Sequence, residues 1–220
     1  NLPKIYLLIG GSPCQGFSFA GKQLNFEDPR SKLFFEFVKI LNHYKPKYFL
    51  LENVKMKQEY QDIISDYLGV QPIEINSALV SAQNRKRLYW TNIPGVDQHK
   101  DKGVLLKDMI EYGTTKHEEN CSLKKIAFIE KKKNNGMYVR VDGNKSLPIT
   151  ARGYAAWNTQ FITDGNKIRD LTLSEYKKLQ TIPEWYSFGE LNKSKATDLI
   201  GDGWTVDVIA HILKGTLQTN

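Results

Sequence analysis

Two short apolar runs, each long enough for one buried strand, flank a helical pattern early in the chain. The runs are KIYLLIG at residues 4–10 and YFLLENV at residues 48–54. Between them, apolar residues recur at the spacing of one helix face, with Asp28 placed as an N-cap, Pro29 in the first turn and Pro46 as the stop. A strand, a helix and a second strand in this order form a parallel crossover unit, which predicts an α/β fold.

The rest of the chain predicts a hairpin and two C-terminal helices. Residues 72–80 and 86–93 are strand-like runs joined by a short polar link. Thr172 and Glu175 have the spacing of a capping box at the start of a helix. The last helix is expected to bury the stripe formed by Val206, Ile209, Ala210 and Leu213.

Residues 94–168 interrupt the α/β pattern. This stretch is polar, turn-rich and basic, and its only regular elements are short strand candidates such as MYVRV and TQFIT. We therefore predict three regions: an α/β domain over residues 1–93, a small lobe of strands and loops over residues 94–168, and a return segment over residues 169–220 that completes the α/β domain.

Charge and composition narrow the class of protein. A formal net charge of +7 favours an anionic partner, nucleic acid first. No apolar run approaches the ~20 residues that span a bilayer, so we expect a cytoplasmic protein without a membrane anchor. The two cysteines, Cys14 and Cys121, lie far apart without a CxxC motif or a histidine cluster, which argues against a metal site.

Cys14 lies in the loop that leaves the strand 4–10, and Glu52 lies at the end of the strand 48–54, which the crossover unit makes parallel to it. Ligands of open α/β sheets bind beyond the carboxyl ends of the strands, so a thiol and a carboxylic acid are expected at one crevice. A thiolate is a strong nucleophile, and a nearby acid can protonate the group under attack. The alternative is a packed cysteine in an ordinary strand-to-helix loop.

Two further patterns have competing interpretations. GFSFAGK at residues 16–22 fits a phosphate-binding loop, but Gln23 stands where a Ser or Thr holds magnesium, which disfavours a nucleoside triphosphatase. Arg85 and Arg87 alternate in SAQNRKRLYW, so both point to one face of an extended segment. Paired guanidiniums suit phosphate or a base edge, whereas the alternative is a pair of solvated charges.

Taken together and in order, these segments resemble the cytosine-C5 DNA methyltransferase family. The resemblance covers residues 5–93 and 169–214 and implies a Rossmann-like, S-adenosylmethionine-dependent methyltransferase fold, with residues 94–168 as a target-recognition lobe. The motifs that carry it are GGSPCQGFSFAGK, FLLENV, QNRKRLYW, RDLTLSEYKKLQTIPEWY and LIGDGWTVDVIAHIL.

The resemblance implies a role for each candidate catalytic residue. Cys14 corresponds to the nucleophile that adds to carbon 6 of a flipped-out cytosine in duplex DNA, so that carbon 5 takes the methyl group of S-adenosylmethionine. Glu52 corresponds to the acid at N3 of the ring. Arg87 corresponds to the arginine that holds the cytosine, with Arg85 supporting the same pocket.

Other positions are expected to bind the cofactor and the DNA. The resemblance assigns Pro13, Leu33, Asp202 and Trp204 to the cofactor site. In the loop after Cys14 it makes Ser18 and Lys22 phosphate contacts, and we add Gln15 as a DNA contact. In the lobe, SLPITARGYAAWN offers base-edge and phosphate chemistry through Thr150, Arg152, Tyr154, Trp157 and Asn158. The alternative is a surface loop whose aromatic residues pack on the lobe.

One family feature has no counterpart in this sequence. Family members carry a Phe-x-Gly-x-Gly cofactor loop and acidic residues upstream of the Pro-Cys-Gln motif. Activity is therefore expected to need an N-terminal half, on a longer chain or on a second polypeptide as in split members. The alternative is a non-catalytic DNA-binding partner subunit or an inactive fragment. Restriction protection, protection of phage DNA against host nucleases and an orphan regulatory role are all compatible settings.

Overall fold

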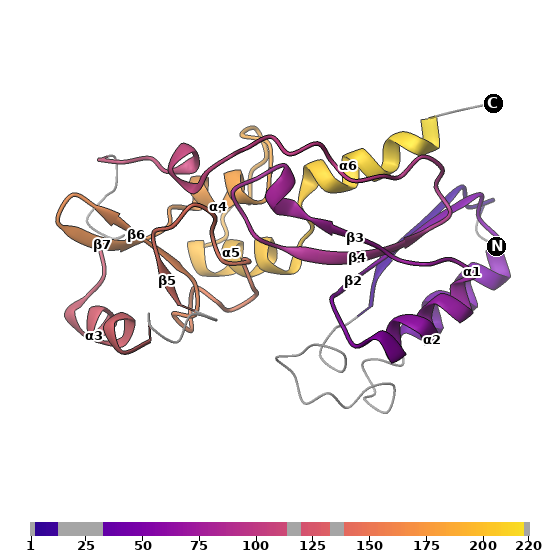
Figure 1. Cartoon of the computed structure of the whole chain (residues 1–220), viewed down its shortest axis with the longest axis horizontal. Coiled ribbons are helices and arrows are strands. Elements are labelled where there is room, and N and C mark those ends of the chain that lie inside the picture. Colours follow the sequence, from indigo (N-terminus) through magenta and orange to yellow (C-terminus); the bar gives the residue numbers. More distant parts are fainter. Residues whose placement is uncertain (1–2, 13–32, 114–119, 133–138, 218–220) are drawn as a thin grey trace. The chain divides into compact units, whose positions relative to one another are not determined.

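A computed structural model of the chain describes residues 3–12, 33–113, 120–132 and 139–217 (Figure 1). The chain divides into two compact units. The first comprises residues 1–76, 86–98 and 211–220, and the second comprises residues 77–85 and 99–210.

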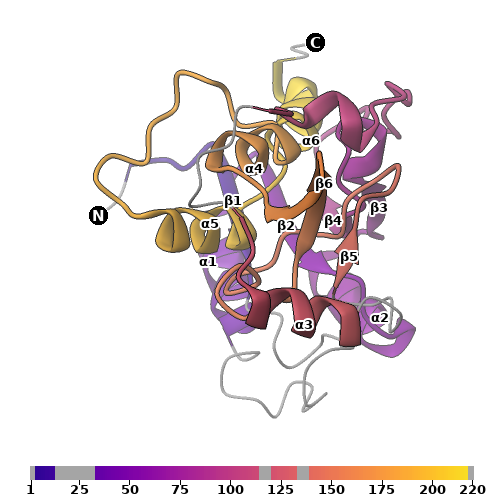
Figure 2. The ribbon, with the colours of Figure 1, turned by 90° about the vertical axis from the view of Figure 1, so that its left-hand side faces the viewer.

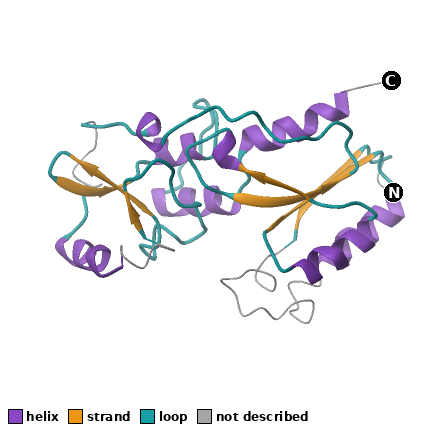
Figure 3. Cartoon of the chain, viewed as in Figure 1, coloured by secondary structure: helices purple, strands orange, loops and turns teal. Residues whose placement is uncertain are grey.

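The first unit is built on a four-stranded sheet in the order β1-β2-β4-β3 (Figure 3). β1 (Leu7–Gly11) and β2 (Tyr48–Val54) are parallel and are linked through α1 (Leu33–Tyr44), which confirms the predicted crossover unit. β3 (Ile73–Asn76) and β4 (Lys86–Thr91) form the predicted antiparallel hairpin, and β4 lies between β2 and β3. The mixed sheet places the carboxyl ends of β1 and β2 at the same edge.

Two helices cover one face of this sheet. α1 lies beside α2 (Gln58–Leu68), and an edge-to-face contact joins the rings of Phe34 and Tyr67 (Figure 1). The apolar side chains of both helices pack against β2 and β4, with Trp90 fully buried. Gly10 of β1 accommodates this packing, because a Cβ there would lie 2.8 Å from the Phe37 ring.

The second unit contains a three-stranded sheet in the order β5-β6-β7, with β5 parallel and β7 antiparallel to β6. Helix α3 packs against this sheet through Ile129 and Phe161 (Figure 2). A second apolar cluster joins Ile149, Tyr176 and Ile200. The elements of the unit are α3 (Leu123–Lys132), β5 (Arg140–Val141), β6 (Gln160–Asp164), β7 (Lys167–Asp170), α4 (Leu173–Leu179) and α5 (Lys193–Asp202).

The strand predicted over residues 72–80 is too long. β3 ends at Asn76, and Ser77–Leu79 forms a 3-10 turn in which the Val80 amide donates to the Ser77 carbonyl. The hydroxyls of Ser77 and Thr205 lie 2.7 Å apart in the buried interior. The bonds of the 3-10 turn satisfy backbone groups of residues 77–80, which the sequence pattern alone assigns to a strand paired with its neighbour.

Two predictions about helices are wrong. Residues 94–168 were expected to hold only strands and loops, yet α3 lies there, begun by a bond from the Lys125 amide to the Ser122 hydroxyl. α6 (Val206–Lys214) is a helix as expected, but it buries Val208 and Ile212, whereas Val206 is exposed. Thr205, Val208 and Ile212 are spaced three and four residues apart and so form one buried face, which differs from the predicted stripe.

The sequence predicts boundaries between functional regions at residues 93/94 and 168/169. These boundaries stay a prediction. The compact units differ from them, because residues 77–85 and 169–210 share an apolar core with the lobe. Across the part of the chain that the structure describes, no helix is long and apolar enough to cross a membrane.

Candidate active site

Glu52 and Arg87 meet at the carboxyl end of β2. Glu52 pairs with Tyr89 in the β2–β4 register, and Arg87 precedes Tyr89 by two residues, so all three share a face. The Nε of Arg87 donates to Oε1 of Glu52 across 3.0 Å, and the two side chains are 16% and 12% exposed. A charge-assisted bond with so little solvent access fixes the direction in which the carboxyl group points.

Asn53 anchors the end of the neighbouring strand. Its side-chain amide donates to the hydroxyl of Ser12 across 2.9 Å, and its carbonyl accepts from the Val54 amide. Asn53 is 1% exposed, and its side-chain amide also donates to the Ser12 carbonyl across 3.4 Å, so its bonds to Ser12 fix the chain just after β1. No role for Asn53 was predicted, although it lies in the Glu-Asn-Val motif and a polar side chain at a buried strand end was the available signal.

The catalytic cysteine candidate lies outside the described residues, together with Pro13, Gln15, Ser18 and Lys22. The structure does describe the chain up to Ser12. In the parallel register Gly11 lies opposite Glu52. Cys14 follows Gly11 by three residues in the sequence.

Arg85 belongs to the second unit and is 4% exposed. Its guanidinium donates to the carbonyl of Ile149 across 2.7 Å and to the carbonyls of Gly201 and Gly203 across 3.1 and 3.0 Å. These bonds connect the residue before the 150–158 loop to the turn before Trp204. The predicted support of a cytosine pocket stays a prediction, and the observed bonds show how Arg85 orders two loops.

Gly201 allows the same two segments to touch. A Cβ at this position would lie 2.3 Å from the carbonyl carbon of Thr150 and 2.4 Å from the amide nitrogen of Ala151. Real Cβ atoms do not approach backbone so closely, so a side chain at residue 201 forces the loop away from α5.

Replacing Gly201 by alanine is therefore expected to lower the free energy of unfolding by about 2 kcal/mol, in the range of overpacked cores. Replacing a glycine inside a helix by alanine usually raises stability, so the expected effect of Gly201→Ala on the free energy of unfolding has the opposite sign. Urea denaturation measures the change, with Lys195→Ala on the exposed side of α5 as the control. An alanine variant as stable as the wild type would show that the loop does not rest on α5.

The predicted cofactor residues are distributed over both units. Leu33 is 51% exposed at the start of α1, whereas Asp202 is exposed at the end of α5 in the second unit. Trp204 is half-buried beside an apolar pocket of about 470 Å³. The rings of Trp185, Tyr186 and Phe188 also line this pocket. Flat apolar walls of this kind suit an aromatic or heterocyclic ligand.

The predicted DNA-contacting residues of the lobe fall into two groups. Thr150, Arg152 and Asn158 are exposed, whereas Tyr154 and Trp157 are half-buried. The rings of Tyr154 and Trp157 lie 5.3 and 5.7 Å from the Lys125 ammonium. The two aromatic residues thus pack within the lobe, and the polar residues face solvent.

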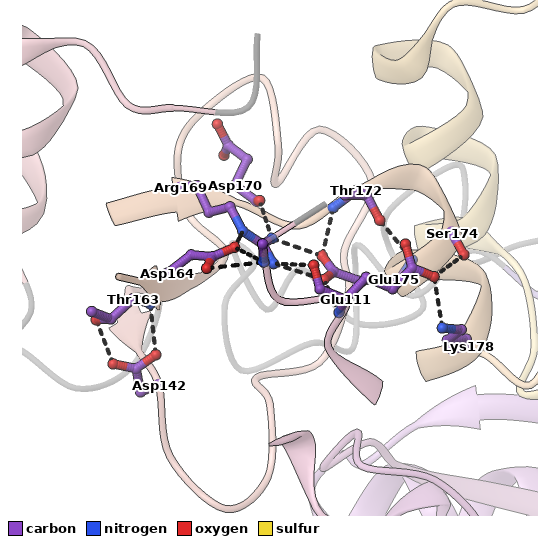
Figure 4. Close-up of polar contacts among 11 residues, drawn as sticks. Glu111, Asp142, Thr163, Asp164, Arg169, Asp170, Thr172, Ser174, Glu175 and Lys178 are labelled. Atoms are coloured by element: carbon purple, nitrogen blue, oxygen red, sulfur yellow. Dashed lines mark hydrogen bonds and ion pairs between the residues drawn. The ribbon is translucent and has the colours of Figure 1, made fainter. Parts of the chain in front are cut away.

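A buried ionic cluster, which the sequence patterns did not predict, lies beneath α4 (Figure 4). The guanidinium of Arg169 is fully buried and binds both carboxylate oxygens of Glu175 across 2.9 Å, and its Nε binds Asp164 across 2.9 Å. Burial alone lowers the pKa of Arg169, but the hydrogen bonds that Arg169 donates to Glu175 and Asp164 outweigh burial and raise the pKa.

The same cluster completes the capping box predicted for α4. The Thr172 hydroxyl accepts from the Glu175 amide, and the Glu175 carboxylate accepts from the Thr172 amide. Nearby, Glu111 binds Lys178 across 2.6 Å, and this hydrogen bond lowers the pKa of Glu111. The Arg169 cluster is thus a structural centre of the second unit.

Among the described residues, no group of three or more His, Cys, Asp or Glu side chains could hold a metal ion. Cys121 is half-buried, and burial raises its pKa to about 11. This second cysteine is therefore a thiol at neutral pH and a weak nucleophile.

At the carboxyl end of β2, Glu52 meets Arg87 of β4, and the neighbouring strand β1 leads along the sequence to Cys14. The model of the family described as C-5 cytosine-specific DNA methylase matches residues 1–218. The chain belongs to this family.

Curated relatives agree with this assignment. The Type II methyltransferase M1.ScrFI of Lactococcus lactis subsp. cremoris is 30% identical over 99% of this chain and 64% of its own length. The Orphan methyltransferase M.Rho11sI of Bacillus phage rho11s is 30% identical over 95% of this chain and 37% of its own length. The chain thus spans between about a third and two thirds of these two relatives.

Solved structures share the fold. The Entamoeba histolytica methyltransferase EhMeth matches with a TM-score of 0.76 and 16% identity, over 97% of this chain and 78% of that one. The S. pombe Dnmt2 methyltransferase matches with a TM-score of 0.67 and 17% identity, over 97% and 79% of the two chains. The fold is therefore that of the S-adenosylmethionine-dependent methyltransferases, as the sequence predicts.

Proposed function

We propose that this chain carries the base-modifying half of a DNA (cytosine-5)-methyltransferase. The observation that carries the proposal is the bond between Glu52 and Arg87 at the end of β2, opposite the strand that leads to Cys14. An acid, a guanidinium and a thiol are the three groups needed to attack a cytosine ring and balance its charge. Glu52 and Arg87 supply the first two, and Cys14 is proposed as the third.

In the proposed reaction, the Cys14 thiolate forms a bond to carbon 6 of cytosine, and Glu52 donates a hydrogen bond or proton at N3. The electron pair that this addition places on carbon 5 attacks the methyl group of S-adenosylmethionine, whose bond to sulfur breaks to leave S-adenosylhomocysteine. Solvent water then takes the carbon 5 proton, and the electrons of that C–H bond restore the ring double bond and expel Cys14 as thiolate, while N3 returns its proton or hydrogen bond to Glu52. Arg87 holds both the cytosine and the Glu52 carboxyl in place.

The target base is proposed to leave the helix before reaction, because carbon 6 of a stacked cytosine is closed to a side chain. Flipping costs a few kcal/mol of pairing and stacking, which contacts to the DNA backbone must offset. Arg152 is exposed on the second unit and is proposed as one such contact, with Gln15, Ser18 and Lys22 as others.

The cofactor is proposed to be S-adenosylmethionine. The apolar pocket beside Trp204 supports this, because its aromatic walls suit an adenine ring, and Asp202 adds an exposed carboxylate nearby. Leu33 and Pro13 are proposed as further contacts. We further propose that these residues work together with a cofactor-binding N-terminal half, carried on a longer chain or on a second polypeptide.

A covalent-trapping experiment tests the proposal. The chain, supplied with a cofactor-binding N-terminal half, is incubated with S-adenosylmethionine and a pool of duplexes in which 5-fluorocytosine replaces cytosine. Fluorine blocks loss of the carbon 5 substituent, so the wild-type protein is expected to remain bound to DNA on a denaturing gel. Cys14→Ser should form no adduct.

Cys121→Ser is the matched control, because the raised pKa of Cys121 keeps it a thiol. This variant is expected to form the adduct as the wild type does. A wild-type complex that binds the duplex but forms no adduct would contradict the enzyme proposal. That result would favour a non-catalytic DNA-binding partner subunit.

A further inference from the structure

The 150–158 loop presents its exposed side chains on a backbone that L-residues rarely adopt. Arg152 and Trp157 have φ angles of +62° and +59°. Such conformations persist only where the surrounding contacts hold them. The contacts that hold this loop therefore also determine where the Arg152 side chain points.

The first contact is a buried lysine on α3. Lys125 is 8% exposed, and its Nζ donates to the two carboxylate oxygens of Asp170 across 2.7 and 2.6 Å. The same ammonium lies 5.3 Å from the ring centre of Tyr154 and 5.7 Å from that of Trp157, both within the loop. A desolvated cation at these distances attracts both ring faces and so holds the loop onto α3.

The second contact is on α5, at the other side of the loop. The carboxylate of Asp198 accepts a hydrogen bond from the backbone amide of Arg152 across 2.7 Å. Arg152 is one of the two residues of the 150–158 loop that have positive φ. Asp198 thus fixes the backbone of the residue whose guanidinium is exposed.

From this geometry we propose that Lys125 and Asp198 are positioning residues, which hold the 150–158 loop in the conformation that presents Arg152 to DNA. The inference rests on the proposed function, because it requires that the loop contacts DNA. Lys125 is too buried to contact DNA itself, so its effect passes through the loop. The strength of DNA binding then depends on two residues that bind no base.

Two substitutions at residue 198 separate positioning from charge. Asp198→Asn and Asp198→Ala remove the same negative charge, which by itself strengthens binding to a polyanion. Only asparagine keeps an oxygen that accepts from the Arg152 amide. Anisotropy of a fluorescein-labelled duplex of about 20 base pairs is expected to show Asp198→Ala binding about fivefold more weakly than Asp198→Asn.

A double-mutant cycle tests whether the effect passes through Arg152. In an Arg152→Ala background, the difference between Asn and Ala at residue 198 is expected to fall below about twofold, because the side chain that it positions is gone. Arg152→Ala alone should reduce the slope of log affinity against log salt by about one. A difference at residue 198 that persists in this background would overturn the proposal.

A pair of substitutions that leaves the net charge unchanged tests the positioning role of Lys125. Lys125→Met combined with Asp170→Asn removes one positive and one negative charge and leaves no buried ion alone. This variant is expected to bind the duplex about fivefold more weakly than wild type, again only where Arg152 is present. If the variant does not fold by circular dichroism, the two variants at residue 198 decide the question alone.

The rate of trypsin cleavage, measured without DNA, distinguishes this inference from the proposed function. Trypsin cleaves after Arg152, and a held loop is cut slowly. Faster cleavage between Arg152 and Gly153 is expected in Asp198→Ala and in the Lys125 and Asp170 variant, but not in Asp198→Asn. Equal cleavage rates in all proteins would overturn the positioning role, whereas a wild type that is cut slowly yet fails to bind duplex would overturn the proposed function.

Discussion

Replacing Glu52 by glutamine is expected to lower kcat for methyl transfer by roughly 10² to 10⁴, the usual contribution of a general acid. Glutamine keeps the shape of the side chain and an oxygen that accepts from Arg87, so the end of β2 should be unchanged. It cannot give a proton to N3, so the negative charge created by the attack of Cys14 on carbon 6 stays uncompensated.

Single-turnover transfer of a labelled methyl group measures this loss, with the chain supplied with the cofactor-binding half. Glu59→Gln is the matched control, because Glu59 is 59% exposed on α2 and belongs to the same unit. The affinity for duplex DNA should be the same in both variants. A Glu52→Gln protein that retains kcat within about twofold of the control would remove Glu52 from the reaction.

The second large effect is on stability. Glu175→Gln is expected to lower the free energy of unfolding by about 3 kcal/mol, the low end of the range for breaking a buried ion pair, because Arg169 loses its bidentate partner but keeps Asp164. The Glu175 carboxylate accepts from Arg169, from the Thr172 amide and from the Glu111 amide. The side-chain NH2 group of glutamine would face one of these N–H groups, and two donors cannot form a hydrogen bond with each other.

Urea denaturation followed by tryptophan fluorescence measures this change. Glu190→Gln, on an exposed residue of the same unit, is the control and should change stability by less than about 0.5 kcal/mol. Asp164→Asn should cost less than Glu175→Gln, because Asp164 is 15% exposed and contacts Arg169 through one bond. If Glu175→Gln is as stable as the control, the cluster does not hold the unit together.

The elements with strong local signals were predicted well from the sequence. β2 occupies residues 48–54 as predicted, because a buried parallel strand is a continuous apolar run with a sharp end. The capping box of Thr172 and Glu175 also forms as expected. α3 was missed because its sequence, LKKIAFIEKK, buries only Lys125 and Ile129, so its apolar face is weak and one of its buried residues is a lysine.

The candidate site was predicted less completely, and the reason is long-range pairing. Glu52 and Arg87 were each predicted from motifs, but their contact depends on the register between β2 and β4, which no local pattern encodes. The Arg169 cluster joins residues 111, 164, 169 and 175, and it satisfies buried charges that sequence patterns treat as surface. Cys14, Pro13, Gln15, Ser18 and Lys22 lie outside the described residues, so their roles stay predictions.

The bonds of Arg85 have a consequence for protein engineering. Its guanidinium holds the carbonyl of Ile149, just before the 150–158 loop, and β6 begins at Gln160, just after it. The loop is therefore fixed at both ends by contacts that do not involve its tip. Residues 155 and 156, both exposed alanines between these anchors, are therefore the positions at which substitutions can test the proposed contact of the loop with DNA while the anchors stay unchanged.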